Sequence, residues 1–124
     1  SDEEKIGYLV ELTGVFPFNR VMKGNVYQQL TEAHIPAIGN YDPELSEVVW
    51  FIPRKVIPKK TKTGKTYWVI EVIDDTNTLT KIRVWGVQDY DKIFINKPYM
   101  AKLEYNGKWG FSTRNLRRNF RILS

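Results

Sequence analysis

Between residues 48 and 111 the chain is a series of short runs of β-branched and aromatic residues, separated by residues that favour turns. Runs of this length with such boundaries are typical of the strands of an all-β domain. The 124 residues leave room for one hydrophobic core. The sequence therefore predicts a single, mainly β domain behind a segment of different character.

Three runs predict the first strands of this domain. The first, 48–57, contains Pro53 and is followed by Pro58, neither of which can donate a ladder hydrogen bond, so we expect this strand to be bent or partly at an edge. The runs 66–74 and 79–86 flank four short polar residues and predict a hairpin.

The rest of the domain follows from two local patterns. Apolar residues at helical spacing in 87–94 predict a short helix. Asn106 and Gly107 are the preferred pair for a two-residue type I′ turn, which places Tyr105 opposite Lys108. In that register the core face holds Ala101, Leu103, Tyr105 and Gly110, and the outer face holds Lys102, Glu104, Trp109 and Phe111. Five strands with a helix between the third and fourth predict an OB-fold barrel.

Both ends of the chain are expected to be helical. Residues 1–42 predict a helical or irregular extension packed on the barrel, and 43–124 predict an OB-fold nucleic-acid-binding domain. Two helices in the extension have apolar stripes, Ile6, Leu9 and Val10 in the first and Val26, Tyr27 and Leu30 in the second. Asn25 and Gln28 could form a capping box for the second helix. An amphipathic helix with a basic face is expected at the carboxyl end, where Arg114, Arg117, Arg118 and Arg121 surround Leu116, Phe120 and Leu123.

Composition excludes several classes of site. The chain has no cysteine, so disulfides, thiolate metal sites and a cysteine nucleophile are excluded. No apolar run approaches the roughly 20 residues of a membrane span, and the amino terminus has no secretory pattern, so we expect a cytoplasmic protein without membrane contact. The net charge of +5 favours polyanionic partners.

Basic and aromatic residues gather where an OB barrel binds oligonucleotides, which is the face of its second and third strands and the adjoining loops. In the third strand Lys81, Arg83 and Trp85 alternate with apolar residues and should point outward. The second strand alternates less clearly, and we place Tyr67 on the binding surface and Trp68 in the core. The predicted nucleic-acid-binding residues are Lys59, Lys60, Lys62, Lys65, Tyr67, Lys81, Arg83, Trp85, Lys102, Trp109, Phe111 and Arg114. Two alternatives remain open: a solvated basic loop, and a face covered by the amino-terminal extension.

Catalysis is not expected from this chain. Asp74 and Asp75 are adjacent carboxylates, but a hairpin turn explains them. His34 is the only histidine and has no acid, serine or cysteine partner in the sequence pattern, so a structural role is expected. We therefore predict neither catalytic residues, nor a metal site, nor a cofactor.

A longer pattern resembles the OB domain of the bacterial family C replicative DNA polymerase, the DNA polymerase III alpha subunit. It consists of residues 64–76, which read GKTYWVIEVIDDT, followed by IRVW at 82–85, and of EKIGYL at 4–9 upstream. Residues 13–17 read TGVFP in place of the family's Ser-Gly-His-Pro, so a divergent or phage-encoded polymerase fits as well as a standard one. The resemblance implies a fragment that touches single-stranded template, with the catalytic carboxylates elsewhere in a longer chain.

The leading hypothesis is a module that binds single-stranded DNA with little sequence preference. The same surface would also suit tRNA or other RNA, because stacking and phosphate contacts do not test for a 2′-hydroxyl. A third hypothesis is a protein-interaction or scaffold module that joins other replication proteins through exposed aromatic residues.

Overall fold

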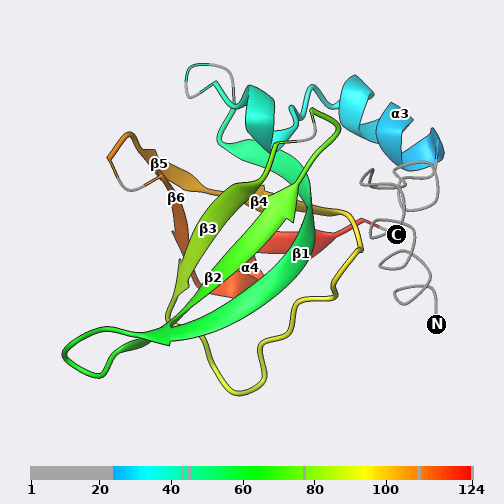
Figure 1. Cartoon of the computed structure of the whole chain (residues 1–124). Helices are drawn as coiled ribbons and strands as arrows, with labels where there is room; N and C mark the ends of the chain where they lie inside the picture. The colour runs from blue at the N-terminus through cyan, green and yellow to red at the C-terminus, as the bar shows by residue number, and fades with distance from the viewer. Residues whose placement is uncertain (1–23, 43, 45, 77, 109, 124) are drawn as a thin grey trace, which may run out of the picture.

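A computed structural model describes residues 24–42, 44, 46–76, 78–108 and 110–123. The helix expected around Ile6, Leu9 and Val10 lies outside these residues. In chain order the elements are α3 (Gly24–Glu32), a 3₁₀ turn η1 (Ile38–Asn40), β1 (Val48–Lys60), β2 (Thr66–Ile73), β3 (Thr80–Trp85), β4 (Tyr99–Lys102), β5 (Glu104–Asn106), β6 (Gly110–Arg114), α4 (Leu116–Asn119) and β7 (Phe120–Ile122) (Figure 1).

The strands form one sheet that curls into a barrel. Their order is β5-β6-β3-β2-β1-β4-β7, and the β3–β6 pair is the parallel one. Only Leu103 separates β4 from β5, so these are two halves of one strand: β4 pairs with β1, and β5 pairs with β6. Leu103 therefore joins β5, at one end of the sheet, to β4 near the other end, and this closes the barrel. A meander of three strands, a fourth strand next to the first and a fifth parallel to the third make an OB-type barrel, which confirms the predicted mainly β fold.

Strand β1 is buried on both faces in its first half. Val49 and Phe51 point into the barrel core, whereas Trp50 and Ile52 pack against α3. The Tyr27 ring meets the Trp50 ring edge-on, with 5.6 Å between centroids. This explains why 48–52 is a continuous apolar run without alternation. The expected bend is also present, because the β1–β2 register shifts between Pro53 and Lys55.

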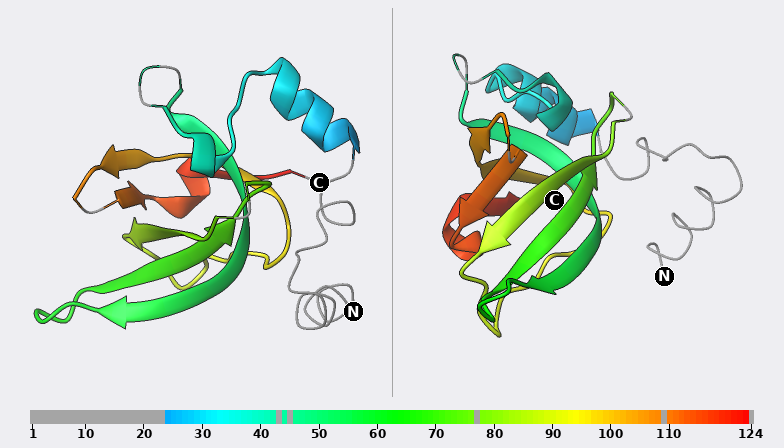
Figure 2. Two further views of the ribbon diagram at one scale, coloured as in Figure 1. Left: turned by 45° about the horizontal axis from the view of Figure 1, so that its top comes forward. Right: turned by 60° about the vertical axis from the view of Figure 1, so that its left-hand side comes forward.

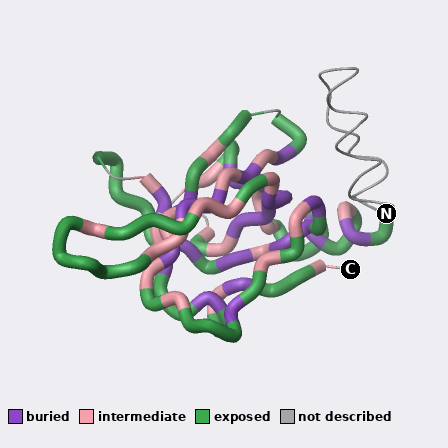
Figure 3. Tube along the Cα trace, turned by 60° about the horizontal axis from the view of Figure 1, so that its bottom comes forward, coloured by how far each residue is buried: buried purple, intermediate pink, exposed green. Residues whose placement is uncertain are grey.

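The barrel core lies between the inner faces of the strands. Figure 3 shows the buried segments running along the strands and the exposed ones at the loops. Apolar residues from every strand except β5 contribute, and Leu103 and α4 complete the cluster: Ile38, Val49, Phe51, Ile70, Val72, Ile82, Val84, Tyr99, Ala101, Leu103, Phe111, Leu116 and Phe120. Helix α3 lies at the end of the molecule opposite the β1–β2 turn (Figure 2).

The helix predicted over 87–94 is wrong. The segment between β3 and β4 consists of turns, and the Asp91 carboxylate accepts the Gln88 backbone N–H at 2.7 Å. Tyr90 and Phe94, whose spacing contributed to the helix prediction, are 61% and 56% exposed. Val87 and Ile93 of this segment pack against the barrel core without forming a helix.

The predicted register of the last hairpin is also wrong. Phe111 lies opposite Tyr105 instead of Lys102, and Asn106 lies opposite Gly110, so the loop has three residues, 107–109. Gly110, which follows this loop as the first residue of β6, is left-handed with φ +76°, a conformation that favours glycine. A slip by an odd number of residues reverses a strand's faces. Ala101 and Leu103 are buried as expected, but Phe111 points into the core and not outward.

The helices at the two ends are shorter or begin elsewhere than predicted. Helix α3 is present with Val26 and Leu30 buried, but it begins at Gly24, so Asn25 lies within the helix and not at the position before it. At the carboxyl end only α4 is helical, and Phe120 begins the strand β7, which pairs with β4. Pairing with β4 buries Phe120 and satisfies strand hydrogen bonds that a longer helix would have left open.

A buried carboxylate joins η1 to the β2–β3 turn. Asp74 is fully buried, and it accepts the Gly39 N–H at 2.5 Å, the Thr76 N–H at 2.9 Å and the Thr76 hydroxyl at 2.5 Å. A β-carbon on Gly39 would lie 2.6 Å from the same carboxylate, so the close approach requires glycine there. This is the turn role expected for Asp74.

Neither α3 nor any other described helix is long and apolar enough to cross a membrane.

Candidate nucleic-acid interface

The outer faces of β2 and β3 carry the basic and aromatic residues that the sequence pattern placed there. Tyr67 lies opposite Trp85, Val69 opposite Arg83, and Glu71 opposite Lys81. The intervening residues of β3, Ile82 and Val84, are fully buried in the barrel. On β2 the orientation is now settled, because Trp68 packs against the barrel core and Tyr67 faces outward beside Trp85.

One row of side chains crosses four strands on this face. Lys59 of β1 lies opposite Tyr67, Tyr67 lies opposite Trp85, and Trp85 lies beside Arg114 of β6 in the parallel register. Residues paired across a ladder point to the same side of a sheet, so the row places two aromatic rings between two cations. We call the outer face of β1, β2, β3 and β6 around this row the stacking face.

The two rings at the centre of the row are stacked. The centroids of Tyr67 and Trp85 are 4.4 Å apart, and the ring planes are 25° from parallel. An open groove of about 630 Å³, which we call the stacking groove, runs beside them. Its walls are Tyr67, Arg83, Trp85, Glu104, Tyr105, Asn106 and Ser112.

The β1–β2 turn projects from the barrel next to this face (Figure 1). It is closed by its own residues: the Thr61 N–H donates to the Lys65 carbonyl at 2.8 Å, and the Gly64 N–H to the Thr61 carbonyl at 3.0 Å. Gly64 has φ +85°, which favours glycine at that point. The lysines of the turn and its flanks are exposed: Lys59, Lys60, Lys62 and Lys65.

The remaining predicted residues lie elsewhere. Phe111 is only 8% exposed and packs in the core, so it cannot offer a free ring to a base. Lys102 lies on β4, away from Tyr67 and Trp85, and forms an ion pair of 3.3 Å with Glu47. Trp109 lies outside the described residues. Lys81 is exposed at the far end of the stacking face from the Tyr67–Trp85 pair.

Sequence reasoning missed the groove walls contributed by the last hairpin. Tyr105, Asn106 and Ser112 line the stacking groove, and the Tyr105 ring is half exposed. It lies 5.0 Å from the Phe111 ring and 5.4 Å from the Tyr41 ring, which hold it from the core side. The two-residue turn assumed at Asn106 and Gly107 gave the wrong register, and only the correct loop length shows which residues of the hairpin share a face.

Among the described residues, no group of three or more histidine, aspartate or glutamate side chains is placed to hold a metal ion. Burial raises the pKa of the Asp75 carboxyl, and the neighbouring Asp74 charge raises it further, but Asp75 lies at the β2–β3 turn and outside the stacking groove. The face offers cations, amides and aromatic rings.

The sequence matches no protein-family model and no curated protein. Among solved structures, the p204 HINb domain is similar, with a TM-score of 0.48 and 12% sequence identity over 77% of this chain and 50% of that one. The chain thus spans half the length of that solved chain. Similarity at this level transfers neither a site nor a function between the two proteins.

Proposed function

We propose that this chain is a binding module for single-stranded nucleic acid, with single-stranded DNA as its ligand and little preference for sequence. The observation that carries the proposal is the row Lys59, Tyr67, Trp85 and Arg114 across the stacking face. Oligonucleotide binding across the second and third strands is the usual mode of an OB barrel.

The row supplies the two interactions that sequence-independent binding needs. A base that enters the stacking groove meets the Tyr67 and Trp85 rings, and every base has a π-face to offer them. The cations on either side of the rings neutralise the adjoining phosphates, which releases counterions and makes the affinity depend on salt. Stacking and phosphate contacts therefore act on successive nucleotides.

The first experiment is a fluorescence-anisotropy titration of a labelled DNA oligomer of roughly 15–20 nucleotides at low and moderate salt. We expect binding that weakens steeply with salt and that quenches tryptophan fluorescence. Absence of binding even at low salt would refute the proposal.

Replacement of Trp85 by Ala locates the site. We expect a loss of about 1–3 kcal/mol, equivalent to roughly five- to 150-fold weaker binding, because each stacked base contributes this much. The matched control is Phe94→Ala, which removes an exposed ring from the loop between β3 and β4, outside the groove. Equal affinities of the two variants would contradict a stacking role for Trp85.

A competition titration with RNA of the same sequence separates DNA from RNA. The proposal expects DNA to compete at least as well as RNA. Tighter binding of RNA would favour the RNA-binding module that the same surface could also form.

We further propose that the chain belongs to a replicative polymerase of family C, on the strength of the sequence pattern GKTYWVIEVIDDT alone. In that setting it would contact the template strand next to the active site. A primer–template with a long single-stranded overhang tests this, because the overhang should be protected from nuclease digestion and the primer duplex should not.

A protein-interaction function has one observation in its favour. Tyr90 and Phe94 are 61% and 56% exposed on the loop between β3 and β4. Salt-insensitive association with another protein, lost in a Phe94→Ala variant that still binds DNA, would assign this loop to a partner.

A further inference from the structure

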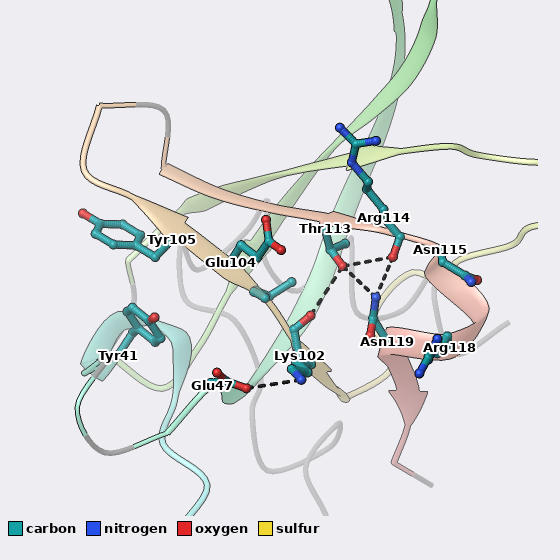
Figure 4. A pocket seen from close by; sticks show the side chains of 11 residues that line it. Tyr41, Glu47, Lys102, Glu104, Tyr105, Thr113, Arg114, Asn115, Arg118 and Asn119 are labelled. Carbon is teal, nitrogen blue, oxygen red and sulfur yellow. Dashed lines mark hydrogen bonds and ion pairs between the residues drawn. The ribbon is translucent and has the colours of Figure 1, made fainter.

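A second hollow, which Figure 4 shows from close by, shares Glu104 and Tyr105 of β5 with the stacking groove. Its volume is about 700 Å³, and its walls come from β4, β5, β6, α4 and the segment before β1. We call it the arginine pocket. It is lined by Tyr41, Glu47, Lys102, Leu103, Glu104, Tyr105, Thr113, Arg114, Asn115, Arg118 and Asn119.

The charges of the pocket are divided between its two sides. On one side Lys102 and Glu47 form an ion pair of 3.3 Å and largely offset each other. On the other side stand Arg114 and Arg118, which form no ion pair with any described residue. Glu104 is the remaining carboxylate of the lining, so the side of the pocket that carries the two arginines has the excess of positive charge.

Hydrogen bonds fix the backbone that carries the two arginines. The Asn119 side-chain amide donates to the Arg114 carbonyl at 2.5 Å and to the Thr113 hydroxyl at 3.2 Å (Figure 4). Asn115 adopts a left-handed conformation with φ 58°, and the Arg118 N–H donates to its carbonyl at 3.1 Å. The turn from β6 into α4 is thus held in place, which lowers the entropy cost of presenting Arg118 to a ligand.

The pocket continues the stacking groove. Glu104 and Tyr105 line both hollows, and Arg114, which lines the pocket, lies beside Trp85 in the β3–β6 ladder. A chain that leaves the aromatic pair past Arg114 therefore meets Arg118 next. Guanidinium groups match phosphate oxygens with paired N–H donors.

We propose that the arginine pocket holds the phosphate backbone of the nucleotides that follow those stacked on Tyr67 and Trp85, with Arg118 as the phosphate ligand and Arg114 as the link between the two sites. This inference rests on the proposed function and gives the bound strand its path: across the stacking face, over the β5–β6 hairpin and onto α4.

The test compares Arg118→Ala with Arg117→Ala on oligo-dT of two lengths. Arg117 is one residue away on the same short helix, but its guanidinium lies 4.6 Å from the centroid of the Tyr90 ring, outside the arginine pocket. The two variants remove the same charge, so they separate a local contact from a change in net charge.

For an oligomer of roughly 15 nucleotides we expect Arg118→Ala to bind about fivefold more weakly and to lower the salt slope by roughly 0.7, the value for one phosphate contact on a single strand. For an oligomer of roughly 5 nucleotides, which fills only the stacking groove, we expect no change. Arg117→Ala should resemble the unaltered protein at both lengths, and Arg118→Lys should retain the salt slope because it retains the charge.

The outcomes distinguish the inference from the proposed function. If Trp85→Ala weakens binding but Arg118→Ala does not at either length, the path is wrong and the stacking site stands. If Arg117→Ala and Arg118→Ala are equally impaired, only the net charge acts, and the path is again wrong. If the unaltered protein binds neither oligomer, both proposals fail.

Discussion

Asp74 shows how one side chain can join parts of the chain that are far apart in sequence. It is fully buried, and its three hydrogen bonds connect η1 to the β2–β3 turn. Ile38 of η1 packs in the barrel core, so the same bonds also anchor the segment that leads from α3 into β1. A buried carboxylate is tolerated here because its acceptor capacity is used.

Replacement of Asp74 by Ala should lower the free energy of unfolding by about 3 kcal/mol, because the Gly39 and Thr76 donors lose their partner inside the protein. Urea denaturation followed by tryptophan fluorescence would measure the loss. A change below about 0.5 kcal/mol, which is the usual range of surface substitutions, would show that the bonds contribute little.

Asp75 should behave in the opposite way. Burial raises the pKa of its carboxyl, and the Asp74 charge adds to the effect, so the folded state binds a proton more tightly than the unfolded state does. The stability that this proton provides is lost as the pH rises from the usual aspartate pKa through the raised one. Asp75→Asn should therefore not destabilise the protein at neutral pH and should flatten the pH dependence over that window, as measured by urea denaturation at several pH values.

Glu104 should oppose binding of a polyanion. It is exposed, it lies opposite Ser112, and it lines both the stacking groove and the arginine pocket. We expect Glu104→Gln to bind single-stranded DNA roughly two- to fivefold more tightly at low salt, the range of an exposed charge interaction. Unchanged affinity in an anisotropy titration would place the strand away from the hairpin.

Side-chain directions could be predicted where the alternation was clear. In β3 the apolar positions Ile82 and Val84 identified the inner face, and Arg83 and Trp85 followed on the outer one. In β2 both faces carry large apolar side chains, because Val69 on the outer face is also buried. The sequence of a single strand does not show what covers its outer face. The outward direction of Tyr67 therefore became clear only from its pairing with Trp85.

At the scale of the elements, the geometry of a turn determines which residues of its two strands pair and share a face. The Asn106–Gly107 pair has the composition of a two-residue turn, yet neither residue has a positive φ among those the structure describes, and the left-handed position is Gly110. Gly107, three places before it in the chain, therefore has no conformation that requires glycine.

Two glycine substitutions test this loop. Gly110→Ala should cost about 1 kcal/mol of stability or more, because alanine is strained at φ +76°. Gly107→Ala meets no atom within 4 Å and should be close to neutral. A type I′ turn would require the reverse order, so the two denaturation midpoints decide between the registers.

The loop between β3 and β4 and the carboxyl-terminal segment were mispredicted for a shared reason. Helical spacing in 87–94 and around Arg117 was present, but spacing shows only which residues could share a face. Whether a neighbour exists to cover that face is a property of the barrel. Phe120 pairs with Ala101 on the free edge of β4 and so lies in a strand, whereas Tyr90 remains exposed.

At the scale of the whole molecule, binding should follow the count of cations along the proposed path. If Lys59, Arg83, Arg114 and Arg118 each contact one phosphate, the logarithm of the affinity should fall with the logarithm of salt concentration with a slope of about −3. Anisotropy titrations between roughly 50 and 200 mM salt would measure it. A slope near zero would contradict phosphate contacts as a main source of affinity.

The OB-type barrel could be predicted because short β-rich runs in the sequence mark the successive strands. The way in which the barrel closes could not be predicted. The break at Leu103, which lets β4 pair with β1 and β7 while β5 pairs with β6, depends on contacts between segments that are distant along the chain. The row from Lys59 to Arg114 needed the same contacts, although all four of its members were named from the sequence.

The closure at Leu103 also bears on how the chain matures during synthesis. Strand β1 is complete at Lys60, but its neighbour β4 extends from Tyr99 to Lys102. At about 5–20 residues per second the ribosome needs roughly 2–8 s to deliver β4. Throughout that interval the edge of β1 that will meet β4 has no partner, so the nascent protein spends seconds with an open sheet.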